Sequence, residues 1–255
     1  MPTRLHSVVF DAADPPALAR FWAALTGWST AHETPDEVAV RPPTDEAGTP
    51  AAPGLPLVFV PVDDPKVVKN RVHIDLDSRS TDHQDALVER ALAAGATPAD
   101  IGQRAVPWVV LADPEGNELC VLDPRPDYAD AGAVAAVVLD TPDPGELAPF
   151  WAAATGYAVE TQPDGDVRLV PPGGRGPRLE LLRTDDPKVA KNRVHLGVAP
   201  GAADDHGAEV DRLRALGASD ADVGQGRQMW TMLADPHGNE LCVLSPRDGE
   251  AHHVI

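Results

Sequence analysis

Alternating apolar and polar positions at the start of the chain predict strands on either side of one helix. Residues 5–12 alternate with the two-residue period of a half-buried strand. Asp14 and two prolines then open a stretch whose apolar residues recur with helical spacing, and Gly27 ends it, so we expect a capped helix. Further alternating runs predict three strands, at residues 28–31, 37–41 and 57–62.

The same order of strand, helix and three strands recurs along the chain. A second unit predicts strands at 72–76, 97–99, 108–112 and 118–122, with a helix at 82–94. A third predicts strands at 134–140, 157–161, 167–170 and 179–183, with a helix at 143–155. The last predicts strands at 194–198, 219–222, 229–234 and 240–244, with a helix at 204–216. We expect residues 42–56 to be a mobile loop and residues 249–255 to be a loose tail.

Two segments of the sequence are written twice at one spacing. DPKVVKNRVH (64–73) returns as DPKVAKNRVH (186–195), and LADPEGNELCVL (111–122) returns as LADPHGNELCVL (233–244). The offset is 122 residues for both, from 64 to 186 and from 111 to 233. Because this period matches a compact domain rather than a solenoid repeat, we expect homologous domains at residues 1–126 and 131–247.

Composition narrows the class of protein. The chain has 255 residues, 43% hydrophobic and 24% charged, as is usual for globular proteins. Its formal charge of −19 disfavours nucleic acid and anionic membranes as partners. We see neither an apolar run long enough to span a bilayer nor a secretion signal. Two cysteines at equivalent positions do not make a disulfide framework, so we expect a cytoplasmic protein.

Lysine is confined to one motif. The chain holds only Lys66, Lys69, Lys188 and Lys191, all inside the twice-written DPKV segment, and arginine carries the positive charge elsewhere. Two interpretations are open. The ammonium groups could catch a ligand carboxylate or phosphate at the rim of a binding site, or a short turn was duplicated intact.

The L-A-x-F-W helix, the K-N-R-x-H segment and the D-P-x-G-N-E-x-C hairpin resemble motifs of the vicinal-oxygen-chelate superfamily. That superfamily groups glyoxalase I, bleomycin-resistance proteins and extradiol dioxygenases, and the resemblance covers nearly all of the chain. It implies an α+β fold of two tandem glyoxalase-like domains, in which pairs of βαβββ modules form cup-shaped mixed sheets. Ligand would lie inside each cup and the helices outside. Because one scaffold serves many reactions, the motifs indicate the fold better than the chemistry.

The resemblance also implies four ligand positions in each cup, on the first and last strands of its modules. Taking each copy as one cup, these are Ser7, Val58, His73 and Cys120 in the first, and Ala136, Glu180, His195 and Cys242 in the second. Glu118 and Glu240 precede the cysteines by two residues, so they share that face about 6–7 Å along the strand. His6 is one residue out of phase and is expected to face outward, unless a bulge turns it.

These positions support two kinds of chemistry. A divalent metal ion would draw its ligands from His73, Glu118, Glu180, His195 and Glu240. Without metal, a histidine beside a glutamate would act as an acid–base pair, so the catalytic candidates are His73, Glu118, His195 and Glu240. Each cysteine is either a thiolate nucleophile or a small core residue.

The tryptophans divide into two pairs. Trp108 and Trp230 either stack on a ligand or pack under the helices, whereas Trp22 and Trp151 lie on apolar helix stripes and are expected in the core. Ser7, Cys120, Trp108, Glu180, Trp230 and Cys242 are therefore the candidates for contacting the ligand.

We expect a glyoxalase-like lyase or isomerase that acts on a small organic metabolite in the cup. The alternative is a binding protein that sequesters a drug or metabolite without turnover, like the bleomycin-resistance relatives. One cup could also be purely structural. The fold family allows cups to form within a copy or by exchange of modules between copies or chains, so a homodimer is an open alternative.

Overall fold

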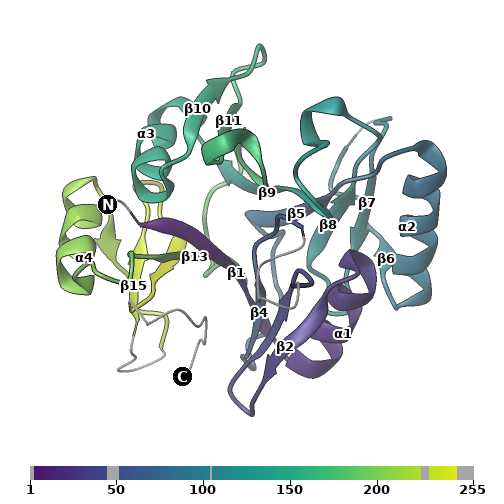
Figure 1. Ribbon diagram of the computed structural model, residues 1–255, viewed down its shortest axis with the longest axis horizontal. Helices are drawn as coiled ribbons and strands as arrows, with labels where there is room; N and C mark the ends of the chain where they lie inside the picture. The colour runs from purple at the N-terminus through teal and green to yellow at the C-terminus, as the bar shows by residue number, and fades with distance from the viewer. Residues whose placement is uncertain (1–2, 45–51, 104, 225–229, 246–255) are drawn as a thin grey trace.

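The computed structural model describes residues 3–44, 52–103, 105–224 and 230–245. It contains the predicted module, strand, helix and three strands, four times (Figure 1). The first module has β1 (Arg4–Ala12), α1 (Pro15–Thr26), β2 (Ser29–Glu33), β3 (Val38–Arg41) and β4 (Leu57–Pro61), and the second has β5 (Val72–Leu76), α2 (Thr81–Ala93), β6 (Thr97–Pro98), β7 (Val109–Ala112) and β8 (Glu118–Val121). The third has β9 (Val134–Thr141), α3 (Pro144–Thr155), β10 (Ala158–Thr161), β11 (Val167–Val170) and β12 (Arg178–Arg183), and the fourth has β13 (Val194–Ala199), α4 (His206–Ala215), β14 (Ser219–Asp220), β15 (Thr231–Ala234) and β16 (Glu240–Val243).

Two 3₁₀ turns complete the described elements: η1 (Pro126–Tyr128) joins the second and third modules, and η2 (Pro172–Gly174) lies inside the third. The expected loop at 42–56 falls partly outside the described residues, and the expected tail at 249–255 falls wholly outside them.

The helix ends follow the predicted local chemistry. The Asp14 side chain accepts a hydrogen bond from the Ala17 N–H at 3.0 Å and so caps α1. Gly27 ends that helix with φ at 71°, a left-handed conformation that glycine adopts without steric cost. Asp143 and Gly156 do the same for α3, which confirms the capped helix in both copies.

The strands form two eight-stranded mixed sheets, and each sheet takes one module from each copy. The order β10-β11-β12-β9-β5-β8-β7-β6 joins the second and third modules; we call this the inner sheet. The order β14-β15-β16-β13-β1-β4-β3-β2 joins the fourth and first modules; we call this the outer sheet. The α+β fold is confirmed, and the modules are exchanged between the copies within one chain.

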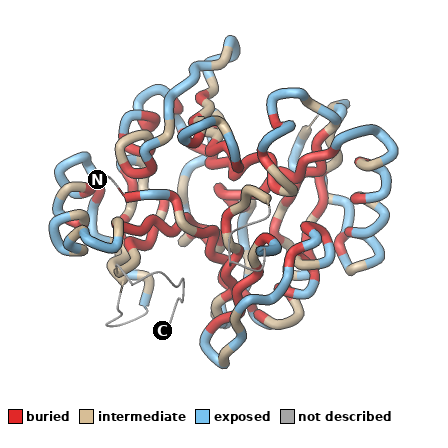
Figure 2. Tube along the Cα trace, in the orientation of Figure 1, coloured by how far each residue is buried: buried red, intermediate tan, exposed pale blue. Residues whose placement is uncertain are grey.

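Each sheet carries its helices on one face and leaves the other face free of them. The side chains of Val72, Ile74 and Leu76 point toward the helices and belong to one large apolar core. Figure 2 shows buried backbone along the strands and exposed backbone along the outer sides of the helices. Trp22 and Trp151 are fully buried in this core, as predicted. None of the described helices is long and apolar enough to cross a membrane.

Candidate functional site

Three polar side chains meet on the helix-free face of the inner sheet. Alternation along β5 turns His73 and Asp75 to this face, and Asp75 pairs in register with Cys120 of β8. His73 Nε2 lies 3.4 Å from Asp75 Oδ1, and the candidate ligand atoms of all three residues lie within 4.8 Å of one another. All three residues are buried. We call the space over this face of the inner sheet the inner cup.

A second polar cluster lines the same face from the third module. Glu180 of β12 pairs with Arg168 of β11, and its Oε1 accepts hydrogen bonds from Arg168 Nε at 3.0 Å and Tyr128 Oη at 2.6 Å. The Arg168 guanidinium also lies over the Tyr128 ring, 5.2 Å from its centroid. Tyr128 comes from η1, so the linker between the copies forms part of the wall of the cup.

This arrangement corrects the assignment of residues to cups. With each copy taken as one cup, Glu180 was expected beside His195, but the exchange of modules brings Glu180 to the sheet that holds His73 and Cys120. The inner cup therefore has Ala136, Glu180, His73 and Cys120 at the four positions that the resemblance implies. The remaining set, Ser7, Val58, His195 and Cys242, lies on the outer sheet.

The helix-free face of the outer sheet, which we call the outer cup, carries different side chains at the corresponding positions. Gly197 stands there in the place of Asp75, opposite Ser7 in register. A Cβ at Gly197 would lie 2.5 Å from Ser7 Oγ and 3.3 Å from Cys242 Sγ, so these two side chains fill the space that a larger residue would need. Burial and the charge of Lys191 lower the pKa of His195 to about 3. His195 is therefore a neutral imidazole at ordinary pH.

In the inner cup the pKa of the histidine shifts in the opposite direction from that of His195. Burial lowers the pKa of His73, but the contact with Asp75 and the charge of that carboxylate outweigh burial, and the net shift is upward. Burial and the neighbouring Asp75 raise the pKa of Cys120 far above its ordinary value. The cysteine is therefore a thiol, and the candidate thiolate nucleophile has no support from its surroundings.

Glu118 and Glu240, the expected acid–base partners of the two histidines, bind the DPKV segments instead. Glu118 Oε1 accepts from Lys66 Nζ at 2.7 Å, and its Oε2 accepts from the Asn70 N–H at 3.1 Å. Glu240 makes the same contacts with Lys188 at 2.9 Å and with the Asn192 N–H at 3.2 Å. Both glutamates therefore fix the DPKV segments, whereas Asp75 is the carboxylate beside His73.

The two remaining aromatic candidates lie on the helix-free faces. Trp108 packs against the apolar cluster of the inner cup, with the Arg125 guanidinium 5.4 Å from its ring centroid. Trp230 packs against the corresponding cluster of the outer cup. Both therefore lie on the helix-free faces rather than under the helices.

His6 lies at a break in the strand pattern. The register of β1 against β13 shifts between Leu5 and Ser7. The matching shift in β9 brings Ala135 and Ala136 together into the cluster on the helix-free face. The bulge at His6 is the exception that the expectation allowed, because it interrupts the alternation from which an outward direction would follow.

Comparison with known proteins accounts for this architecture. The family model described as a glyoxalase-like domain matches residues 7–122 and 136–244. The chain belongs to this glyoxalase-like family. It is therefore a tandem member of the vicinal-oxygen-chelate superfamily.

Solved structures share the fold at low sequence identity. A putative dioxygenase from Bacillus subtilis has a TM-score of 0.64 and 15% identity, over 98% of this chain and 88% of that one. Glyoxalase I from Zea mays has a TM-score of 0.63 and 15% identity, over 96% of this chain and 92% of that one. No curated protein gives a match. These likenesses show the shared fold, and the chemistry has to be argued from the side chains.

Members of this superfamily often bind a divalent metal ion, and one donor set of the glyoxalase-like chain fits such an ion. Asp75 Oδ1 is buried and makes no well-formed hydrogen bond within the described part of the chain. With His73 nitrogen and Cys120 sulfur it offers a set that suits a borderline-soft ion such as zinc. Of the predicted metal ligands only His73 belongs to this set, because Glu118, Glu180 and Glu240 are engaged by cations and His195 lies in the outer cup.

Proposed function

We propose that the glyoxalase-like chain is an enzyme of the lyase or isomerase type, which acts on a small organic molecule in the inner cup. The observation that carries this proposal is that the cluster of His73, Asp75 and Cys120 and the cluster of Glu180, Arg168 and Tyr128 belong to the same face of the inner sheet. The outer sheet has Gly197 and Val58 at the positions that correspond to Asp75 and Glu180. One cup would then do the chemistry while the other completes the fold.

His73 is the residue best placed to move a proton. Its raised pKa allows it both to hold a proton and to release one near neutral pH, and Asp75 orients the ring. Cys120, as a buried thiol, would shape the floor of the cup. In the alternative mechanism, His73, Asp75 and Cys120 would together hold a divalent ion, and His73 would then be a ligand rather than the proton carrier. That ion would supply a Lewis acid that polarises a substrate carbonyl.

Non-catalytic binding is the second candidate. Tyr128 of the linker and Trp108 of the second module give the inner cup aromatic surface, which suits tight binding of a planar or apolar molecule. The two free cysteines agree with a reducing compartment such as the cytoplasm for either function. A partner chain is not required to complete a cup, because the four modules of one chain form both sheets.

Matched variants in the two cups test the proposal. Libraries of carbonyl compounds, catechols and antibiotics are first screened by thermal shift, and hits are then followed for turnover by mass spectrometry. We expect His73→Asn to lower turnover by about 10²-fold or more, and His195→Asn, its counterpart in the outer cup, to leave it within a few-fold. Binding without turnover in the wild type would favour sequestration. Equal sensitivity of turnover to both variants would refute the assignment to one cup.

The metal site has its own test. Elemental analysis of protein purified without chelator is expected to show one divalent ion per chain, reduced by Asp75→Asn and Cys120→Ser. Cys242→Ser is the matched control, because Cys242 occupies the equivalent position of the outer cup. Equal metal content in all three variants would remove this trio as the binding site.

A further inference from the structure

A cavity of about 510 Å³ lies between the two copies of the DPKV segment. Residues 64–71 and 186–193 line it, together with Asp11 of β1 and Asp140 of β9. This volume is typical of a site for a small organic ligand. His73, Asp75 and Cys120 are not among its lining residues, so the cavity is distinct from the proposed catalytic cluster.

Every lysine of the chain lines this one cavity, and the four fall into two pairs. Lys66 and Lys188 each donate hydrogen bonds to a main-chain carbonyl and to a glutamate. Lys66 Nζ donates to the Val68 carbonyl at 2.9 Å and to Glu118 at 2.7 Å. Lys188 Nζ makes the equivalent bonds to the Ala190 carbonyl at 2.8 Å and to Glu240 at 2.9 Å. This pair holds the two loops in shape.

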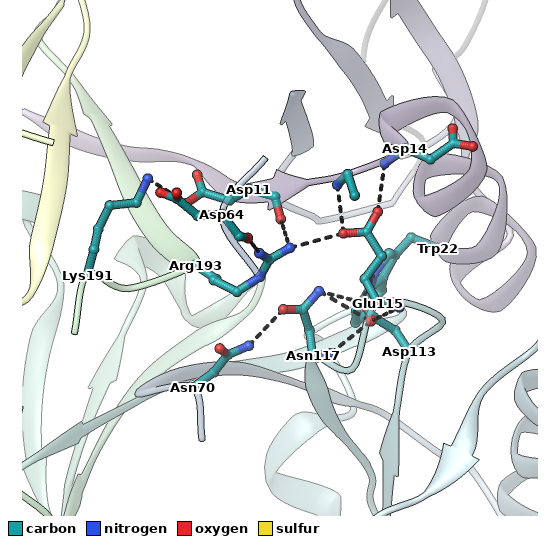
Figure 3. A network of polar contacts seen from close by, with 11 residues as sticks. Asp11, Asp14, Trp22, Asp64, Asn70, Asp113, Glu115, Asn117, Lys191 and Arg193 are labelled. Carbon is teal, nitrogen blue, oxygen red and sulfur yellow. Dashed lines mark hydrogen bonds and ion pairs between the residues drawn. The ribbon is translucent and has the colours of Figure 1, made fainter. Parts of the chain in front are cut away.

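Lys69 and Lys191 form the second pair and keep donors to spare. Lys69 Nζ contacts Asp140 Oδ2, and Lys191 Nζ lies 2.7 Å from Asp11 Oδ2 (Figure 3). An ammonium group has three N–H donors, so each lysine retains two beyond the contacts described for it. Their side chains are 32% and 26% exposed. The cavity therefore has two equivalent cationic donors, one from each copy.

Arg71 adds a buried positive charge without a carboxylate among its hydrogen-bond acceptors. Its guanidinium donates to Asn239 Oδ1 at 3.1 Å and to the main-chain carbonyls of Asp186 at 2.9 Å and Asp140 at 2.8 Å. Its counterpart Arg193 makes similar carbonyl contacts but also pairs with Glu115 at 3.0 Å (Figure 3). The second copy has His237 at the position of Glu115. Among the described residues, Arg71 therefore donates to neutral oxygens where Arg193 has a carboxylate partner, and its guanidinium adds positive charge to the wall of the cavity.

The cavity also offers apolar surface. Val67 and Val189 line it from the two loops and are 73% and 72% exposed. Carboxylates line the cavity as well: Asp11 and Asp140 are each paired with a lysine, and Asp64 and Asp186 begin the two DPKV segments. A carbon chain with an anionic group at each end would meet one lysine of each copy and cover both valines.

We propose that this cavity binds a small organic dianion of the dicarboxylate class, with one carboxylate at Lys69 and the other at Lys191. The two ends of the ligand occupy equivalent places in the two copies, and the carbon chain lies between Val67 and Val189. Because the site is distinct from the inner cup, this assignment does not depend on the proposed catalytic function.

Isothermal titration calorimetry with straight-chain dicarboxylates, from butanedioate to octanedioate, tests the proposal. We expect one chain length to bind best, at least about tenfold more tightly than the monocarboxylate of equal length. Lys69→Gln and Lys191→Gln are each expected to weaken that affinity about tenfold or more. Arg90→Gln removes the same charge from an exposed position on α2 and is the matched control, expected to bind like the wild type.

Three results would overturn the assignment: no dicarboxylate binding at millimolar concentration, equal affinity for monocarboxylates, or equal weakening by Arg90→Gln. Lys69 and Lys191 lie in segments preceding different modules, so the two variants test the site independently, and melting curves show whether each one folds. His73→Asn is expected to retain dicarboxylate binding. Failure of this site would therefore be distinguishable from failure of the inner-cup proposal.

Discussion

Replacing Asp75 with asparagine is expected to lower the pKa of His73 by more than one unit. In the folded protein the upward effect of Asp75 outweighs the downward effect of burial, which leaves the pKa above 6.5. His195 shows what a buried histidine does without such a neighbour, since Gly197 replaces Asp75 there and the pKa is about 3. One pKa unit corresponds to about 1.4 kcal/mol, so the fall from 6.5 to about 3 at His195 represents on the order of 5 kcal/mol against the protonated ring, and the Asp75 carboxylate has to offset a cost of this kind at His73.

The sign of the linked stability effect follows from these directions. A histidine whose folded pKa is raised stabilises the fold fully below pH 6.5, and this contribution is lost as the pH rises through the folded pKa. In Asp75→Asn the folded pKa lies below that of the unfolded chain. Protonation then favours the unfolded state, so the variant should lose stability, relative to the wild type, as the pH falls below 6.5.

Proton–carbon NMR of the histidine rings between about pH 4 and pH 9 measures this directly in chelator-treated protein. His73→Asn identifies the His73 signal by its loss, and the His195 signal serves as an internal control that Asp75→Asn should leave in place. A His73 signal that titrates at the same pH in wild type and variant would refute the argument that Asp75 sets its charge.

Three further outcomes follow from contacts outside the proposed chemistry. Gly197→Ala should lower the free energy of unfolding in urea by about 1–3 kcal/mol, because its Cβ would lie 2.5 Å from Ser7 Oγ, and adding Ser7→Gly should restore part of the loss. Burial raises the pKa of Asp113 from 3.8 to about 6, so the folded state holds this proton more tightly than the unfolded chain. The free energy of unfolding should therefore fall by about 3 kcal/mol through this group as the pH rises from 3.8 to about 6, and Asp113→Asn should remove this pH dependence. Burial raises the pKa of Cys120 and of Cys242, so neither should react with a thiol reagent at about pH 8 until the chain is unfolded; rapid reaction of the native protein would contradict this.

The order and faces of the elements were predictable because their causes are local. Asp14 and Gly27 mark the two ends of a helix by capping chemistry alone, and alternation along a strand was enough to bring His73 and Cys120 to one face. His6 shows the limit of that argument. A bulge depends on the partner strand, which the alternation of one segment does not reveal.

Glu118 and Tyr128 show what local patterns leave out. Alternation placed Glu118 on the face of Cys120, but its carboxylate is drawn to Lys66 and to the Asn70 N–H by a loop that folds back from the start of the module. Tyr128 lies in a linker without periodicity, so its sequence context gave no sign that it enters the inner cup. Both positions depend on contacts between segments distant in sequence, which local patterns do not contain.

The pairing of modules was hidden by the repeat itself. β1 pairs with β13, and β9 pairs with β5. Because β13 and β5 both begin with Val-His after the same K-N-R triplet, no local signal determines which of them pairs with β1 and which with β9. Yet the choice determines the chemistry. It joins Asp75 of the second module to Glu180 of the third, while Gly197 and Val58 meet on the other sheet. The exchange of modules within one chain thus gathers Asp75, His73, Cys120 and Glu180 on one sheet, whereas two separate domains would have divided this set.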